Sequence, residues 1–187
     1  MRIVSVDPSL SNTCLTVADL EDGVLTVLDS VTIETSKATN KQVRASSDLI
    51  SRCRALHVEC QEFLNKYNPV LVFIETPSGS QSASGMKSYG VSCFIAATIQ
   101  PQPIEVTPHE VKMASVGKKT ASKKEMIEWA FNKHPEAPWV IRGGFPLMKQ
   151  EHMADSIAVV YAGITTGDFE RALSLLGPNG LAKKCSG

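Results

Sequence analysis

The stretch that decides the fold is residues 1–34, MRIVSVDPSLSNTCLTVADLEDGVLTVLDSVTIE. Met1–Val6 is predicted to be a short buried strand that stops at the Asp-Pro pair, because proline has no backbone N–H to donate to a sheet. A second strand is predicted over Asn12–Asp19 and a third over Val24–Glu34, where β-branched residues recur. A Glu-Asp-Gly turn signal lies between them at 21–23. The stretch therefore predicts a three-stranded antiparallel meander.

The period of the hydrophobic residues changes after the meander. Between residues 41 and 67 they recur at steps of three and four, as on one face of a long amphipathic helix. Val70–Ile74 is a continuous apolar run, which predicts a central strand covered on both faces. Residues 76–90 are rich in Ser and Gly and are predicted to form a loop, followed by a buried helix over 91–99.

The C-terminal half predicts one more strand and three helices. The strand is Ile104–Val106, and Thr107-Pro108 begins a helix whose capping box is completed by Glu110. Further helices are expected over 122–134 and 151–164, separated by a loop. We predict one domain over 1–166 and a tail over 167–187, with a short helix and then a flexible end. The elements together predict an α/β fold with a mixed five-stranded sheet, a three-stranded antiparallel meander plus parallel strands, flanked by helices on both faces.

Composition limits the classes of protein. The 187 residues suit one α/β domain. A formal net charge of zero argues against a protein that coats DNA with its whole surface, but it allows a nucleic-acid enzyme with a local basic face. Five cysteines without CxxC pairs or a signal peptide favour free thiols. No apolar run approaches the ~20 residues of a membrane span, so a cytoplasmic protein is expected, in the host cytoplasm if a virus encodes it.

Three acidic residues stand at the ends of predicted core elements. Asp7 closes the first strand, Glu75 closes the apolar strand, and Asp155 lies in the last helix with His152 one turn earlier. Residues at i and i+3 share a helix face, so His152 and Asp155 can point at one site. Carboxylates beside aliphatic runs are costly to bury unless they are paired or bind metal. The sequence therefore predicts a divalent-metal site built from separate elements.

Each of these residues also has a structural interpretation. Asp7 alone suits a turn before proline, Asp155 alone suits a solvated helix position, and His152 alone suits a helix start. For Glu75 alone, a structural role and a functional role are about equally favoured, because it directly ends a buried strand. Their order and flanking residues together favour a functional site.

The flanks of these acids resemble one known family. Asp-Pro-Ser-Leu-Ser-Asn-Thr at 7–13 resembles the first motif of RuvC-type Holliday-junction resolvases, and Leu71–Glu75 resembles their second acidic strand. Glu-His-Met-Ala-Asp-Ser at 151–156 resembles their C-terminal acidic helix. Residues 106–112 and 117–125 resemble the basic region of the family. The resemblance spans residues 1 to about 164.

The resemblance implies a ribonuclease H-like fold and an endonuclease that cuts two opposing strands of a four-way DNA junction as a homodimer. It implies that Asp7, Glu75, His152 and Asp155 bind two Mg²⁺ ions, with Mn²⁺ as a substitute, and that Lys112 lies near the scissile phosphate. The predicted DNA contacts are Lys112, Lys118, Lys119, Lys123, Ser78, Ser80 and Tyr89. Phosphate contacts by lysine supply affinity without reading sequence.

Two departures from the family pattern affect these expectations. Cys14 stands where the family usually has glycine, which implies an ordinary backbone conformation there. The loop after Glu75 has no aromatic residue at its start, and Tyr89 or Met86 are the nearest substitutes for a junction wedge. The biological setting stays open between repair of cellular recombination intermediates and debranching of viral DNA.

Three other functions are consistent with parts of the pattern. A nuclease for RNA–DNA hybrids would use the same site. A non-catalytic nucleic-acid-binding module would not need the complete set of acids. Actin-like nucleotide-binding proteins also place Asp at the end of their first strand, but they need a second lobe for which this chain has no room.

Overall fold

The fold is built around one mixed sheet of five strands in the order β3-β2-β1-β4-β5. The computed structural model describes residues 1–77, 79 and 81–182. The strands β1, β2 and β3 are antiparallel neighbours, whereas β4 is parallel to β1 and β5 is parallel to β4. Their bounds are Arg2–Asp7 for β1, Asn12–Glu21 for β2, Val24–Glu34 for β3, Leu71–Glu75 for β4 and Ile104–Val106 for β5. The predicted sheet is confirmed.

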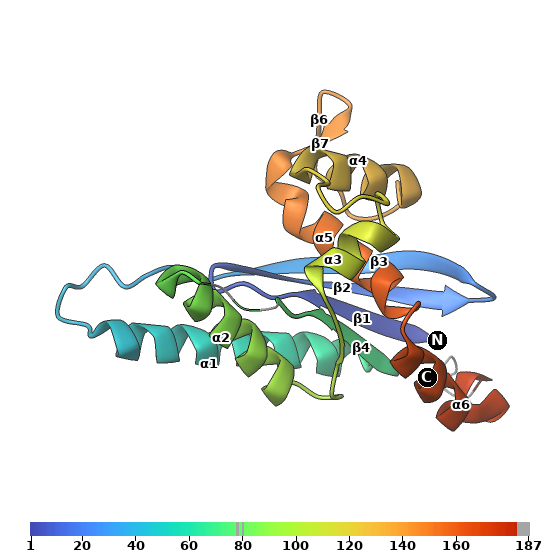
Figure 1. The fold of residues 1–187 in the computed structure, drawn as a ribbon, viewed down its shortest axis with the longest axis horizontal. Helices are drawn as coiled ribbons and strands as arrows, with labels where there is room; N and C mark the ends of the chain where they lie inside the picture. The colour runs from blue at the N-terminus through green and yellow to red at the C-terminus, as the bar shows by residue number, and fades with distance from the viewer. Residues whose placement is uncertain (78, 80, 183–187) are drawn as a thin grey trace.

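Helices cover both faces of the sheet, as predicted (Figure 1). On one face lie α1, Ala45–Tyr67, and α2, Ala83–Thr98. On the other face lie α3 (Pro108–Ala114), α4 (Lys123–Lys133) and α5 (Glu151–Gly163). Of these, α5 contacts strands β1, β2 and β4 directly. Helix α6, Gly167–Ala182, follows and has a kink at Gly177. None of the helices in the described part of the chain is long and apolar enough to cross a membrane.

The alternation of side chains along a strand decides what each face carries. In β1, Val4 and Val6 join the core beneath α1, while Ile3 joins the core beneath α5. Ser5 and Asp7 follow Ile3 at steps of two, so they share the α5 face. In β4, Phe73 lies in the α5 core, and Glu75 is two residues later on the same face. The acidic ends of both strands therefore point to the side on which α5 packs.

The structure corrects three expectations about element bounds. Helix α1 begins at Ala45 rather than near residue 41, and residues 41–44 before it are exposed and find no core to pack on. Helix α2 begins at Ala83, so residues 83–90 are helical rather than loop; the Ser82 hydroxyl accepts from the Gly85 N–H and caps them. The predicted loop over 134–149 contains a small hairpin of β6, Ile141–Arg142, and β7, Phe145–Pro146. A 3₁₀ turn, Met148–Gln150, follows that hairpin.

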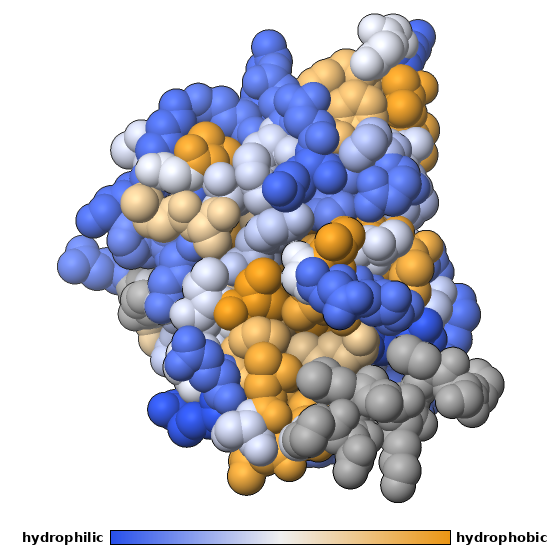
Figure 2. Space-filling view, turned by 90° about the vertical axis from the view of Figure 1, so that its right-hand side faces the viewer, coloured by the Kyte–Doolittle hydropathy of each residue, from blue (hydrophilic) through white to orange (hydrophobic). Residues whose placement is uncertain are grey.

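Helix α6 packs against the end of the sheet that carries the β2–β3 turn. Phe169 is buried against Phe73, with ring centroids 5.9 Å apart. A hollow of about 520 Å³ lies between α6 and this turn and is lined by Met1, Leu20, Phe169 and neighbours. Figure 2 views the molecule from this end and shows hydrophobic side chains gathered over the lower half of that face. The division into a domain over 1–166 and a tail over 167–187 stays a prediction, as does the flexible end, much of which falls outside the described residues.

Gly163, at the end of α5, lets the helix approach β4 closely. A Cβ atom at this position would overlap the ring of Phe73, which is fully buried. We expect Gly163→Ala to lower the free energy of unfolding by about 1–3 kcal/mol, since overpacking forces the ring or the helix to shift. Gly90→Ala in α2, where nothing lies within 4 Å of the added atom, is the matched control. It should raise stability by up to about 1 kcal/mol through helix propensity. Urea denaturation measures the free energy of unfolding of both variants. Equal effects would contradict the close approach of Gly163 to the Phe73 ring.

Candidate active site

Asp7 and Glu75 lie side by side at the carboxyl ends of two neighbouring parallel strands. Val6 is paired with Ile74 in the β1–β4 register, so the next residues, Asp7 and Glu75, are adjacent. Strand β1 ends there because Pro8 follows and cannot continue the ladder. The Asp7 side chain is 15% exposed, so it opens to solvent at the edge of the core.

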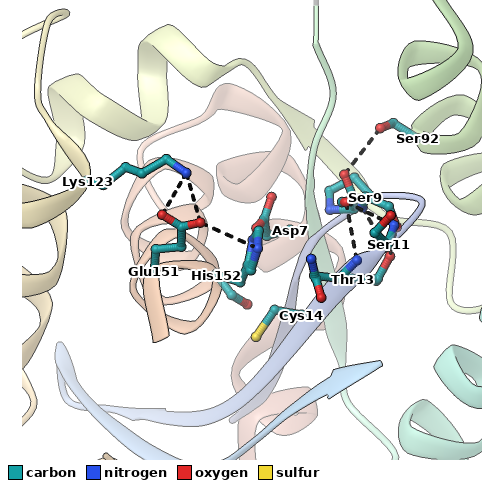
Figure 3. A network of polar contacts seen from close by, with 12 residues as sticks. Asp7, Ser9, Ser11, Thr13, Cys14, Ser92, Lys123, Glu151 and His152 are labelled. Carbon is teal, nitrogen blue, oxygen red and sulfur yellow. Dashed lines mark hydrogen bonds and ion pairs between the residues drawn. The ribbon is translucent and has the colours of Figure 1, made fainter. Parts of the chain in front are cut away.

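Helix α5 brings His152 and Asp155 over this edge. His152 Nδ1 lies 3.0 Å from Oδ2 of Asp7, which joins residues 145 positions apart in the chain. His152 and Glu151 precede Asp155 by three and four positions, so each lies next to Asp155 on the surface of α5. Figure 3 shows His152 beside Asp7, with Glu151 next to them.

A buried hydrogen bond fixes the position of α5 on the sheet. The Ser156 hydroxyl donates to the backbone oxygen of Ser5 at 3.2 Å, and both serines are fully buried. Ser5 lies two residues before Asp7, and Ser156 directly follows Asp155. The pair therefore holds the two acidic residues at a constant offset, because any sliding of α5 would leave buried polar groups unpaired.

Burial and the nearby negative charges raise the pKa of Glu75 and of Asp155. Burial raises the pKa of Glu75 to about 8, and the charges of Asp7 and Asp155 add to the effect. Burial likewise raises the pKa of Asp155 to about 7, with Asp7 the next contributor. The hydrogen bond to Asp7 raises the pKa of His152. Around neutral pH the pocket therefore retains protons on groups that would ionise freely in water.

Lys112 supplies positive charge to this pocket from α3. Its charge lowers the pKa of both Glu75 and Asp155, in opposition to the burial that raises them. The expected place of Lys112 near the scissile phosphate stays a prediction. Helix α3 is fixed at its start by the predicted capping box, in which Thr107 accepts from the Glu110 N–H and Glu110 accepts from the Thr107 N–H.

The other predicted DNA-binding lysines differ in their surroundings. Lys123 Nζ lies 2.7 Å from Oε2 of Glu151, which connects α4 to the acidic face of α5 (Figure 3). Lys118 pairs with Glu125. Lys119 is exposed, and among the described residues the structure gives it no ion pair. Of these three lysines, Lys123 is tied most directly to the acid pocket.

The predicted contacts near the loop after β4 are only partly described. Ser78 and Ser80 lie outside the described residues. Tyr89 is partly exposed on α2, and a hydrogen bond with Cys93 of the same helix raises its pKa. Its described polar partner thus lies on its own helix, and the role of Tyr89 in DNA binding stays a prediction.

Cys14 of β2 lies beside Asp7, on the side of β1 opposite to Glu75 of β4. The two residues are paired in the β1–β2 register, and Cys14 is fully buried in an ordinary strand conformation. Burial raises the pKa of its thiol to about 11. Cys14, Cys53, Cys60 and Cys93 are all free thiols, whereas Cys185 lies outside the described residues.

Glu151 is the one residue of this cluster that the sequence prediction did not select. Its side chain is 19% exposed and binds Lys123, and its carboxylate lies 3.8 Å from Nε2 of His152. The signal was available in the sequence, because Glu151 precedes Asp155 by four positions and therefore shares its helix face.

The donor chemistry of the cluster suits a hard divalent cation. Three carboxylates and one imidazole lie together, and burial with the neighbouring carboxylates raises the pKa of Glu75 and of Asp155 despite the opposing charge of Lys112. A cation would supply the missing charge. In the described part of the chain, no three His, Cys, Asp or Glu side chains are placed to bind one ion together as they stand. One oxygen of Asp7 is taken by His152.

Known proteins were compared with the chain in sequence and in structure. No family model matches the sequence. The chain is 24% identical over 131 residues to the crossover junction endodeoxyribonuclease RuvC of Prochlorococcus marinus, which covers 68% of this chain and 78% of that protein. Thermus thermophilus RuvC in complex with a Holliday junction substrate superposes with a TM-score of 0.64 over 87% of this chain and 92% of that one, at 18% identity. The chain is RuvC-like in sequence and in fold.

A second structure supports this assignment of the fold. The yeast mitochondrial Holliday junction resolvase Ydc2 matches 93% of the RuvC-like chain with a TM-score of 0.54 at 12% identity. The two TM-scores show a shared architecture, and the mixed five-stranded sheet predicted from the sequence is confirmed. The sequence match shows that the likeness to RuvC extends to the amino-acid sequence as well as to the backbone fold.

Proposed function

We propose that the chain is a structure-selective endodeoxyribonuclease that cleaves four-way DNA junctions. The observation that carries the proposal is the meeting of Asp7, Glu75, His152 and Asp155 from β1, β4 and α5 in one pocket. The likeness to RuvC of Prochlorococcus marinus and of Thermus thermophilus supports DNA as the substrate and a branched structure as the feature that is selected.

Asp7, Glu75, His152 and Asp155 would hold two Mg²⁺ ions, with Mn²⁺ as a substitute because imidazole suits softer ions. When bound, such ions lower the pKa of the attacking water and stabilise the leaving oxygen. His152 orients Asp7 through their 3.0 Å contact. The buried Ser5–Ser156 hydrogen bond keeps Asp155 in register with Asp7. Lys112 would meet the phosphate, since its charge already reaches both Glu75 and Asp155.

Cleavage on two opposing strands requires two active sites, and the described part of the chain contains one such acid cluster. We therefore propose a homodimer. Supporting evidence is a groove of about 390 Å³ between α1 and α2, lined mainly by apolar residues. In this groove Ile50 is 52% exposed and Met86 48% exposed.

We expect Ile50→Lys to shift the chain toward monomers in sedimentation experiments, whereas Val24→Lys, which changes a residue 65% exposed on β3, should not. A wild-type monomer at every concentration that supports paired cleavage would contradict this arrangement.

The proposed activity is tested by incubating the chain with three labelled substrates: a synthetic four-way junction, a linear DNA duplex and an RNA–DNA hybrid. Each is tested with Mg²⁺, with Mn²⁺ and with EDTA. The expected result is metal-dependent, symmetrically placed nicks in the junction alone. Cleavage of the hybrid without the junction would instead assign the pocket to an RNA-strand nuclease.

Lys119 offers a test of the predicted basic surface. If it contacts a phosphate, Lys119→Ala should weaken binding to every junction sequence by a similar factor. It should also reduce the slope of log affinity against log salt by about 1. Lys133→Ala, at the far end of α4, is the control. An unchanged salt slope in fluorescence-anisotropy titrations would remove Lys119 from the interface.

A further inference from the structure

A groove of mixed polar and apolar lining continues from the acid cluster toward the edge strand of the sheet. Its volume is about 410 Å³, which lies in the range of small-molecule sites. His152 and Glu151 line it, so it is directly connected to the pocket that contains Asp7. The sequence prediction gave this groove no role, and the proposed metal site does not use most of its lining.

One wall of the groove is an extension of the strand ends that carry the acids. Asp7 pairs with Cys14 of β2, and Cys14 pairs with Thr32 of β3. Residues paired in this way point to the same face of a sheet, so a single row runs from Asp7 to Thr32. Figure 3 shows Cys14 close to Asp7 in this row. Asn12 and Glu34 form the next row beyond it and also line the groove.

The other wall is formed by the segment between α4 and α5 and is held in place by internal bonds. The Val140 N–H donates to Oε1 of Gln150 at 2.7 Å, and the Trp139 indole N–H donates to the His134 oxygen at 2.7 Å. His134 is buried, with one ring nitrogen 2.8 Å from Glu136 and the other 2.8 Å from the Tyr161 hydroxyl. The wall is therefore preformed, and a ligand would not have to order it on binding.

The charges and the lining residues of the groove favour a neutral ligand with polar edges. Glu34 and Glu151 are offset by Lys149 and by Lys123, which pairs with Glu151, so the lining has no excess of positive charge that would select a phosphate. Asn12, Thr32 and Gln150 offer hydrogen-bond donors and acceptors, while Pro138 and Val140 offer apolar contact area. Polar edges combined with an apolar face match the chemistry of a nucleobase.

We propose that this groove binds one nucleobase of the DNA strand whose phosphate lies in the acid pocket, and that it sets the base preference of cleavage. The inference rests on the proposed function, because it places the groove next to the phosphate that is cut. The flat side of the base would pack on Val140, and its edge would meet the polar residues of β2 and β3. A base in this position adds specificity while the lysines add general affinity.

The direct test uses binding rather than cleavage. Four-way junctions carrying 2-aminopurine at successive positions are titrated with the Asp7→Asn protein, and the fluorescence change is recorded for each position. One position should respond, and the response should be lost when Thr32→Trp fills the groove. Thr26→Trp, the same change at an exposed position of the same strand outside the groove, is the matched control and should keep the response. Val140→Asp serves as a second groove variant, because Val140 is 52% exposed and its replacement should not affect folding.

Cleavage of a junction library with randomised bases at the branch point gives the second readout. The wild-type chain and the Thr26→Trp control should prefer one base at one position, and both groove variants should reduce that preference at least tenfold. If the wild type binds and cuts junctions but the groove variants keep its fluorescence response and base preference, the groove inference is overturned. A wild type that cuts without base preference overturns it as well. Failure of the wild type to bind or cut junctions instead overturns the proposed function.

Discussion

Asp7→Asn is expected to abolish junction cleavage while leaving junction binding nearly unchanged. The substitution keeps the size of the side chain and its ability to accept from His152, but it removes the charge at the point where β1, β4 and α5 meet. Replacing partners of metal ligands already costs about 10–100-fold, so the loss of a central ligand should reduce the cleavage rate by more than about 100-fold. Single-turnover cleavage and anisotropy titration on the same junction measure the two properties separately.

Asp29→Asn is a suitable control for that experiment. Asp29 lies on β3, paired with Val17 of β2, and interacts with Tyr67 and Lys66 rather than with the acid pocket. This variant should cleave like the wild type. Retained cleavage by a clean Asp7→Asn preparation would separate the acid cluster from the chemistry and remove the basis of the proposed function.

Glu75→Gln is expected to stabilise the metal-free protein at alkaline pH. The folded-state pKa values of Glu75, about 8, and Asp155, about 7, lie above the ordinary values of 4.5 and 3.8. The folded chain thus binds these protons more tightly than the unfolded chain. As pH rises from about 4 to 8, the unfolded state ionises freely and the free energy of unfolding falls, levelling off above about 8. The loss attributable to the site should be on the order of a few kcal/mol.

The measurement is urea denaturation in EDTA at pH 5 and pH 8. Wild type and Glu75→Gln should be similarly stable at pH 5, and the variant should be the more stable at pH 8. Glu59→Gln, which changes an exposed residue of α1, should follow the wild type at both pH values. Addition of Mg²⁺ at pH 8 should raise the stability of the wild type more than that of Glu75→Gln, because a bound ion balances the crowded carboxylates. Equal stability of the two proteins at pH 8 would mean that Glu75 ionises without penalty.

The local signals in the sequence predicted most elements of the fold. The Asp-Pro pair ends β1, the Asp22-Gly23 pair forms the two-residue turn between β2 and β3, and the capping box of Thr107 and Glu110 begins α3 as short-range chemistry requires. The prediction was wrong where the local amino-acid composition is atypical of the element that forms. Residues 83–90 are rich in Ser and Gly yet form the first half of α2, because one serine cap and the packing of the second half on α1 are sufficient.

The sequence by itself determined the strand and helix periods and the positions of Asp7, Glu75 and Asp155 at the ends of core elements, because those features depend on neighbours within a few residues. Tertiary structure alone decided which side chains meet. The parallel register of β1 and β4 sets Asp7 beside Glu75, and the Ser5–Ser156 bond sets α5 so that His152 reaches Asp7. The raised pKa values and the groove beside His152 follow from that convergence, since burial and charge proximity depend on distances in space rather than along the chain.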